Sequence, residues 1–414
     1  MIKLIQFLLL LIIFITPLIT PFLNFGFEQA KVVVFSYFVD ITAIIFLFYL
    51  IKNRSKVNFK FSQINYFALN FLLILFLTSL LGLDPLTSFF GTSPYYQGFL
   101  LYFNLFIFSI LIYLSKLNLR QISIALISSS LLISLLAIWQ FIQLHLLGKL
   151  IPTYAGRVVS TFGQPNFYAG FLLLILPSLL NLLKELKGKS LILGRFLVVI
   201  LYIGILISNS RVSFIISSVF IVFWFLSFLS IKIKKIVFLA LATSIVLSLI
   251  ISLVLSTGLI YKEIFEPKTS LWLINNSPEK RVNIWPLALK IYLQKPLTGY
   301  GLENIDLAFS DYFKKNKHFL FEENLHTNPA LFTLKDLNIN STHNYILDLG
   351  LYSGILGILA YLLIVSLMLK NLKYKYLLIS LLTYLIWAQF QNQSVVQLMF
   401  FWMLMGLSID KQYF

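Results

Sequence analysis

Residues 344–369 read NYILDLGLYSGILGILAYLLIVSLML, and this stretch decides the fold class of the chain. Only one side chain that is charged at neutral pH, Asp348, interrupts a run long enough to cross a hydrocarbon core of roughly 30 Å. Similar apolar runs recur along the 414 residues, of which 59% are hydrophobic and only 11% charged. Soluble domains carry about 25% charged residues. The sequence therefore predicts an all-α polytopic membrane protein.

About twelve transmembrane helices are expected, and the distribution of basic residues orients them. The expected spans are residues 4–23, 32–51, 64–81, 98–115, 122–144, 167–183, 190–208, 211–230, 236–257, 344–369, 376–390 and 394–409. Every second connection between them is rich in Lys and Arg, whereas the alternate short connections hold only Lys31, Lys149, Arg157 and Arg211. Cytoplasmic loops carry the excess of basic residues, so both termini are predicted to be cytoplasmic.

The chain is expected to have three parts. Residues 1–257 form a bundle of nine spans, residues 258–343 form one large extracytoplasmic segment, and residues 344–414 form the last three spans. The start of the chain is interpreted as an uncleaved span, because no small-residue cleavage site follows it. Residues 284–293 predict an amphipathic helix, and Pro-Leu-Thr-Gly-Tyr-Gly at 296–301 predicts a turn. A small helical cap on the outer face is therefore expected.

His343 stands just before the apolar run that opened this section. Asn340, Ser341 or Thr342 is expected to cap the helix, which places His343 in its first turn. A helix N-terminus favours anions and a neutral imidazole, so His343 is a candidate base. Gly350, Gly354 and Gly357 would lie within about 40° of the His343 direction on that helix. Small residues allow close helix packing, which predicts that this face packs against protein. An interfacial His that only bonds a neighbour remains an alternative.

Four further polar residues are predicted on the outer side. Arg211 opens a span after Ser210, Arg281 lies in the large outer segment, and Arg157 and Asn166 lead into the sixth span. Arginine offers a planar fork that suits phosphate. The alternatives are a snorkelling Arg211, a solvated Arg281, and a Pro165-Asn166 pair that only initiates a helix. Asp348 is expected to be a weak partner for His343, because it would lie about 140° away round the helix.

The absence of several sequence features narrows the chemistry. The chain has no cysteine and no nucleotide-binding G-x-x-x-x-G-K-[ST] motif, and no metal site or cofactor is expected from its motifs. The net charge of +17 is distributed over membrane loops, so no nucleic-acid partner is expected. Chemistry outside the membrane would need a donor that arrives already activated and lipid-anchored. A lipid-linked diphosphate sugar fits, with diphosphate on Arg and an acceptor hydroxyl helped by a base.

The arrangement of these motifs resembles the O-antigen ligase and O-antigen polymerase superfamily, which includes bacterial O-linked protein oligosaccharyltransferases. The family motif is His, then Asn, Ser or Gln, nine residues, Gly, two residues, then Gly, Thr or Tyr. His343-Asn344, Gly354 and Gly357 match it completely. Three other motifs are similar to those of the family, and they cover Ser210-Arg211, Arg281 with Trp285, Pro296, Gly299 and Gly301, and Thr161 to Asn166.

The resemblance implies a metal-independent glycosyltransferase in the cytoplasmic membrane. It implies that His343 activates an acceptor hydroxyl and that Arg211 and Arg281, with Arg157, Asn166 and Asn344 nearby, hold the diphosphate of an undecaprenyl-linked glycan. The acceptor would be lipid A-core or another surface acceptor, and membrane lipids would surround the enzyme. A repeat polymerase, a protein oligosaccharyltransferase and a multi-pass transporter are the alternatives.

Overall fold

The computed structural model describes residues 1–53, 61–154, 156–226, 277–315 and 339–409. The chain divides into two compact units. The first comprises Met1–Ser217, Ala288–Tyr312 and Asn338–Phe414, and the second comprises Ser218–Leu287 and Phe313–Leu337. The site described below lies in the first unit. The expected division at residues 257 and 343 stays a prediction.

Helices make up nearly all of the described chain. They are α1 (Ile2–Ile15), η1 (Thr16–Leu18), α2 (Phe27–Lys52), α3 (Gln63–Leu80), α4 (Pro85–Phe90), α5 (Phe99–Ser115), α6 (Leu119–Phe141), η2 (Ile142–Leu146), α7 (Pro165–Leu182), α8 (Gly188–Ile207), α9 (Arg211–Leu226), α12 (Ser277–Tyr292), α13 (Ile305–Lys315), α16 (Tyr345–Asn371), α17 (Lys375–Trp387) and α18 (Val395–Ser408). Two short antiparallel strands, β1 (Thr153–Tyr154) and β2 (Arg157–Val158), form the remaining elements.

Six of the described helices are long and apolar enough to cross a membrane, and five shorter apolar helices accompany them. They coincide with eleven of the predicted spans. The twelfth prediction, at residues 236–257, lies outside the described residues. The prediction of a polytopic all-α protein is confirmed, whereas the count of twelve and the orientation stay predictions.

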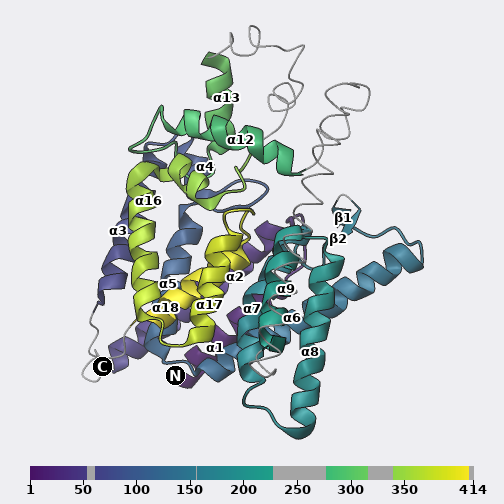
Figure 1. The fold of residues 1–414 in the computed structure, drawn as a ribbon. Helices are drawn as coiled ribbons and strands as arrows, with labels where there is room; N and C mark the ends of the chain where they lie inside the picture. Colours follow the sequence, from purple (N-terminus) through teal and green to yellow (C-terminus); the bar gives the residue numbers. More distant parts are fainter. Residues whose placement is uncertain (54–60, 155, 227–276, 316–338, 410–414) are drawn as a thin grey trace, which may run out of the picture. The chain divides into compact units, whose positions relative to one another are not determined.

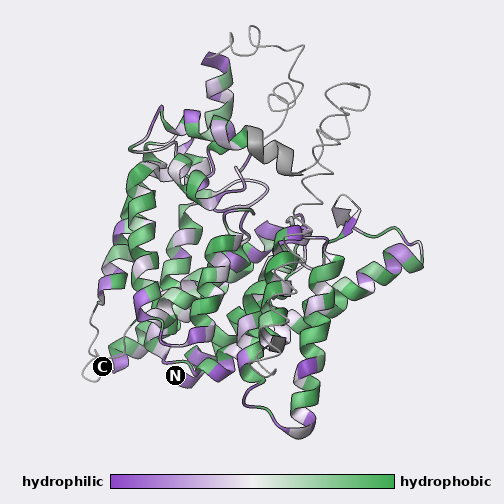
Figure 2. Ribbon diagram, in the orientation of Figure 1, coloured by the Kyte–Doolittle hydropathy of each residue, from purple (hydrophilic) through white to green (hydrophobic). Residues whose placement is uncertain are grey.

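Helices that are far apart in the sequence pack side by side in the first unit. The α16 helix packs against α3, α18 against α5, α6 against α8, and α17 against α7 (Figure 1). Almost every side chain of α18 is buried, although this helix is short. Hydrophobic residues dominate the helices (Figure 2), and many of their large side chains are exposed, among them Ile44, Phe196 and Leu363. An apolar exposed flank is what a lipid environment requires.

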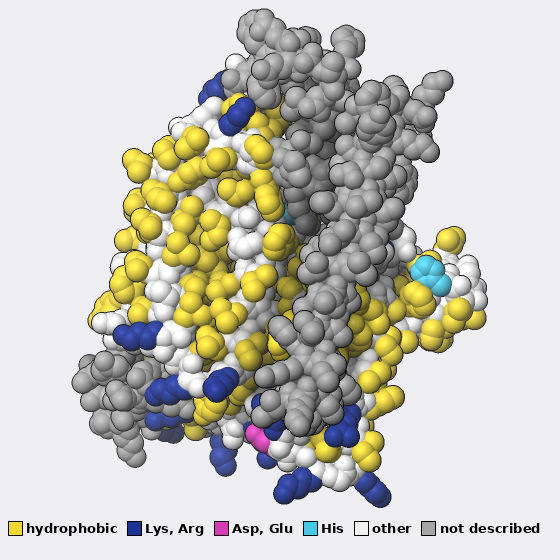
Figure 3. Space-filling view, viewed as in Figure 1, with side chains coloured by type: hydrophobic (Ala, Val, Ile, Leu, Met, Phe, Trp, Pro, Cys, Tyr) yellow, Lys and Arg dark blue, Asp and Glu magenta, His cyan; other side chains and the backbone are white. Residues whose placement is uncertain are grey.

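Basic side chains gather at one end of the bundle, which Figure 3 shows below its hydrophobic flank. This end, called the basic end below, holds Lys116, Lys187 and Lys373 in the turns after α5, α7 and α16. Gln6 of α1 donates a hydrogen bond to Ser115 O at 2.8 Å, which places the start of the chain there as well. By the positive-inside rule the basic end is the predicted cytoplasmic side.

Lys31 differs from expectation, because it lies within α2 and not in a connecting loop. Its side chain is completely buried, and Nζ donates to Ile19 O at 2.7 Å and to Thr161 O at 2.5 Å. It also lies 5.0 Å from the centre of the Phe162 ring. A buried ammonium needs such partners. Lys31 therefore anchors the segment that leads into α7, which begins at Pro165, two residues before the predicted span.

Candidate functional site at the end opposite the basic end

His343 precedes α16 instead of lying in its first turn, which corrects the sequence-based expectation. The cap is Asn344, whose Oδ1 accepts the N–H of Leu347 at 3.1 Å. His343 has a left-handed backbone with φ of 59°, a conformation that costs a side-chain-bearing residue roughly 1 kcal/mol. His343 and the three glycines therefore do not share one face of a helix, as the sequence had predicted. A half-buried His held in this conformation needs other groups to stabilise it.

Asp348 supplies that support, although the sequence indicated only a weak relation to His343. The buried carboxylate accepts the backbone N–H of Thr342 at 2.7 Å through Oδ1, and Oδ2 lies 2.6 Å from Ser341 Oγ. Ser341 Oγ in turn accepts the backbone N–H of His343 at 3.0 Å. We call residues 341–344 the His343 turn. Its backbone is therefore fixed by a carboxylate one helical turn further along the chain.

Two residues that sequence reasoning did not assign to the site complete this network. Asn392 Oδ1 lies 2.7 Å from Ser341 Oγ, and Asn392 Nδ2 donates to the phenol oxygen of Tyr95. Burial raises the pKa of Tyr95 above its ordinary value, which keeps the phenol protonated. The signal in the sequence was the polar run Gln389, Gln391, Asn392 and Gln393 between two apolar helices. This run is the turn between α17 and α18, and residues 391–393 are buried.

The α16 helix is broken at Gly354, which corrects the expectation that Gly350 and Gly354 lie on one continuous helix. Gly354 has φ of 65° and ψ of −164°, outside the helical region. A Cβ on Gly354 would lie 2.2 Å from Leu297 O, and one on Gly299 would lie 2.6 Å from Leu351 O. Each glycine therefore admits the backbone of the other segment.

Backbone hydrogen bonds explain why the break is tolerated inside an apolar helix. Ile355 donates to Pro296 O at 2.7 Å, Tyr300 donates to Leu351 O at 2.7 Å, and Gly301 donates to Tyr352 O at 3.0 Å. These bonds satisfy groups that an unbroken helix would pair internally. The P-x-x-G-x-G and H-N-x₉-G-x₂-G motifs are thus two halves of one backbone junction. Gly350 faces the Tyr292 ring, and Gly357 packs against Ser353 of its own helix.

Glu303 connects this junction to the segment that carries Tyr95. Its buried carboxylate accepts the backbone N–H of Gln97 at 2.5 Å and the backbone N–H of Thr92. Burial raises the pKa of Glu303 to about 7, and the two N–H donors oppose that rise. Residues 92–97 are therefore held from both sides, by Glu303 and by the bond between Tyr95 and Asn392.

Arg157 and Arg211 form a second polar group, called the arginine pair below. Arg157 lies in β2, is half-buried, and donates from Nη1 to Asn209 O at 3.4 Å, two residues before the exposed Arg211 that begins α9. Burial lowers the pKa of Arg157, and the positive charge of Arg211 lowers it further. No carboxylate among the described residues forms an ion pair with either guanidinium. Two neighbouring cations of this kind repel each other until an anion is bound.

The turn after α17 joins the two groups. Tyr345, two residues after His343, donates its N–H to Ala388 O at 3.0 Å. The neighbouring Trp387 donates from Nε1 to Ser213 Oγ at 3.3 Å, and Ser210 Oγ bonds Ser213 Oγ at 3.2 Å. The His343 turn and the first turn of α9 are therefore attached to consecutive residues, 387 and 388.

The other predicted site residues are Asn166, Asn344 and Arg281, and the structure describes fewer contacts for them. Asn166 is the second residue of α7 and is half-buried, and Asn344 is occupied as the cap of α16. Arg281 lies in α12, where the structure does not describe its side chain, and it belongs to the second unit. Among the described residues, no group of three His, Asp or Glu could hold a metal ion.

The fold and these groups define a polytopic membrane protein with a buried, hydrogen-bonded polar site at the end opposite its basic end. Residues 196–362 match the protein family described as O-antigen ligase. The match includes Arg211, Arg281, His343 and the three motif glycines, and it supports the predicted similarity to the O-antigen ligase superfamily. Members of this family are membrane glycosyltransferase-like ligases. No curated protein gives a significant match to the chain.

Proposed function

We propose that this protein transfers a glycan from a polyprenyl diphosphate carrier to an acceptor hydroxyl, at the outer face of the cytoplasmic membrane. The O-antigen ligase match supports glycosyl transfer in a membrane. The assignment of His343 as the base rests on the fixed His343 turn, which Asp348 and Asn392 hold through Ser341. Such preorganisation is what a positioned base requires.

The His343 imidazole takes the proton of the acceptor hydroxyl as the oxygen attacks the anomeric carbon of the glycan. A glycosidic bond forms, and the bond between that carbon and the carrier diphosphate breaks. The electron pair leaves with the polyprenyl diphosphate. A neutral imidazole is needed at the start of this step, and the imidazolium formed returns its proton to water or to the leaving group.

The arginine pair stabilises the leaving diphosphate. Arg211 is exposed and Arg157 is half-buried, so the two guanidinium groups offer charged donors to an anion. The arginines stabilise the transition state more than the bound substrate, because negative charge accumulates on the leaving oxygens as the bond breaks. Arg281 is assigned the same role by the family motif. An acceptor such as lipid A-core or another surface acceptor would approach from the His343 side.

The test is the length of the lipid-linked glycan in cells with and without the gene. Long finished chains that accumulate on the carrier when the gene is deleted indicate a ligase or transferase that unloads them. Accumulation of single repeats instead indicates a polymerase. Unchanged carrier-linked glycan would contradict glycosyl transfer altogether and favour transport.

Variants separate the assigned roles from general damage. His343→Ala and Arg211→Ala are each expected to abolish transfer while the protein remains in the membrane. Matched controls are His145→Ala, which alters an exposed His in η2, and Arg195→Ala, which alters an exposed Arg in α8. Normal glycan product from either site variant would rule out the corresponding role.

A further inference from the structure

The first turn of α2 holds two buried, oppositely charged side chains that the proposed transfer does not use. Glu28 and Lys31 are three residues apart, so their side chains lie on the same face of the helix. Glu28 is 5% exposed and Lys31 is completely buried. The carboxylate and the ammonium attract each other. Charged side chains are almost never fully buried unless they are paired, and each of these two also has a backbone partner in another segment.

Glu28 binds the segment that carries Asn392. Its Oε2 accepts the backbone N–H of Val395, the first residue of α18, at 3.1 Å. Asn392 lies three residues earlier, in the turn between α17 and α18, and its Oδ1 is 2.7 Å from Ser341 Oγ of the His343 turn. Glu28 therefore fixes the start of the helix next to the residue that supports the His343 turn.

Lys31 binds the segment that links the arginine pair to α7. Its Nζ donates to Thr161 O at 2.5 Å and to Ile19 O at 2.7 Å. Thr161 lies four residues after Arg157 and five residues before Asn166. Lys31 therefore fixes the backbone between the half-buried arginine and the start of α7.

The two segments attached to α2 also contact each other. Gln397 in the first turn of α18 is completely buried, and its Nε2 donates to Phe167 O at 2.7 Å. Phe167 is the third residue of α7. The starts of α2, α7 and α18 thus form a closed set of contacts in which Glu28 and Lys31 supply both contacts of α2. A displacement at one of these helix starts is transmitted to the other two.

We propose that the Glu28–Lys31 pair couples the position of the arginine pair to that of the His343 turn. The inference rests on the proposed function, in which the arginines hold the diphosphate and His343 takes the proton of the acceptor. Both groups must be aligned with the same anomeric carbon, because a small misplacement of either lowers the rate steeply. Glu28 and Lys31 are buried and act through other residues, so they are positioning residues.

Hydrogen exchange of the purified full-length protein, measured by mass spectrometry, tests the coupling without reference to activity. Glu28→Gln removes the charge but keeps an acceptor oxygen, and Lys31→Met removes the ammonium but keeps a side chain of similar length. Each variant is expected to speed exchange at least about threefold in residues 157–166 and also in residues 389–398, although each side chain bonds only one of these segments. Acceleration confined to the directly bonded segment would overturn the coupling.

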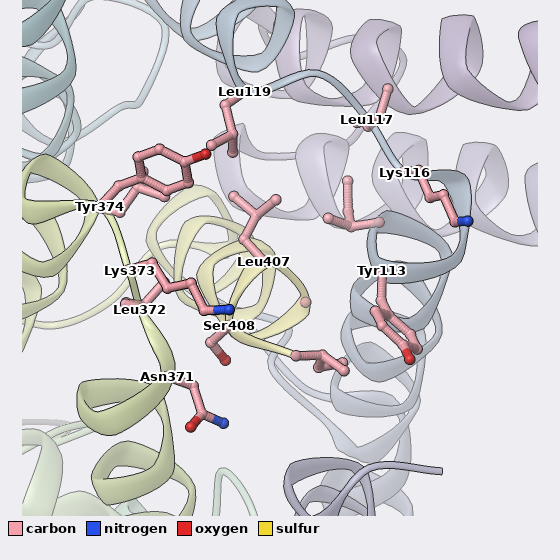
Figure 4. Close-up of a pocket in the computed structure, with 14 residues that line it drawn as sticks. Tyr113, Lys116, Leu117, Leu119, Asn371, Leu372, Lys373, Tyr374, Leu407 and Ser408 are labelled. Carbon is pink, nitrogen blue, oxygen red and sulfur yellow. The ribbon is translucent and has the colours of Figure 1, made fainter. Parts of the chain in front are cut away.

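A buried control distinguishes coupling from general damage. Leu117 is buried and lines a cavity of about 150 Å³ at the basic end (Figure 4), away from both polar groups. Leu117→Ala should leave the exchange of both segments as in the wild type. An equal acceleration in Leu117→Ala would show that any loss of packing loosens these segments and would also overturn the proposal.

The double variant Glu28→Gln/Lys31→Met separates positioning from stability. Removal of one member leaves the other charge buried and uncompensated, whereas removal of both does not. The double variant should therefore unfold at a higher temperature than either single variant, yet transfer glycan at least about tenfold more slowly than the wild type. The matched control Glu185→Gln/Lys189→Met removes two exposed, opposite charges at the basic end and should transfer normally. Recovery of transfer together with stability would show that the pair serves the fold alone.

Failure of the proposed function would look different. In that case His343→Ala would retain normal transfer, while exchange in both segments would still respond to Glu28→Gln. Loss of transfer in His343→Ala without coupled exchange would instead leave the proposed function standing and refute the role of the pair.

Discussion

At the scale of single residues, the orientation of His343 depends on a carboxylate that is not expected to touch substrate. Asp348 fixes the backbone of the His343 turn through Thr342 N–H and Ser341 Oγ. The left-handed backbone of His343 is maintained against its intrinsic preference by these bonds. Asp348 is therefore a positioning residue for the proposed transfer.

Asp348→Asn is expected to lower kcat for glycan transfer by roughly 10–100-fold with a smaller change in KM. The amide keeps the size of the side chain but removes the negative charge, so its hydrogen bonds to the Thr342 N–H and to Ser341 Oγ are weaker than those of the carboxylate. Steady-state transfer with lipid-linked donor measures both constants. Asp306→Asn, at the start of α13, is the matched control. An unchanged kcat would show that Asp348 serves the fold alone.

At the scale of elements, the break in α16 and the loop at residues 296–301 form one structure. The three backbone hydrogen bonds between them replace bonds that the helix loses at Gly354. The break would be unfavourable in α16 alone, because an apolar helix favours continuous internal hydrogen bonding. The junction attaches residues 296–301 to the same helix that the His343 turn precedes.

Gly354→Ala is expected to destabilise the folded protein by about 2 kcal/mol or more. The added Cβ would meet Leu297 O at 2.2 Å, and φ of 65° disfavours a side chain. Thermal unfolding of the detergent-solubilised protein measures the loss. Gly26→Ala is the control, because nothing lies within 4 Å of its added Cβ. A thermal midpoint as high as that of the control would contradict the proposed role of the junction.

Glu303 makes the free energy of unfolding of the protein depend on pH. Burial raises its folded-state pKa from the ordinary 4.5 to about 7, so the folded state binds more protons than the unfolded state between these values. Stability should therefore fall as pH rises from 4.5 to 7, by on the order of 3 kcal/mol at most. Glu303→Gln should remove this part of the pH dependence. Unfolding midpoints measured from pH 5 to pH 8 test it, and parallel curves for both proteins would refute it.

At the scale of the whole molecule, the two ends of the bundle differ in chemistry. Lysines dominate the basic end, while the opposite end holds the buried network of Asp348, Asn392 and Glu303. The basic end is the predicted cytoplasmic side, and the opposite end carries the groups to which the proposed reaction is assigned. In that proposal the lipid-linked donor approaches from the membrane at the opposite end.

The absence of cysteine makes the orientation directly testable. A single cysteine introduced as Lys149→Cys, in the exposed segment after η2, should react with a membrane-impermeant thiol reagent in intact cells. Lys187→Cys, in the turn before α8, should react only after the membrane is permeabilised. The reverse pattern would invert the predicted topology and move the proposed site to the cytoplasm.

The sequence alone determined the class of the protein and most of its membrane helices, because hydrophobicity and charge are summed along local stretches. It also identified the motif residues, including His343, Arg211 and the glycines. Tertiary structure decided which contacts those residues make. The break at Gly354, the support of His343 by Asp348, and the recruitment of Asn392 and Tyr95 all depend on hydrogen bonds. The partners in these hydrogen bonds lie far apart in the sequence and meet only in the folded chain. The hydrophobic periodicity of one segment does not show which other segment it will contact.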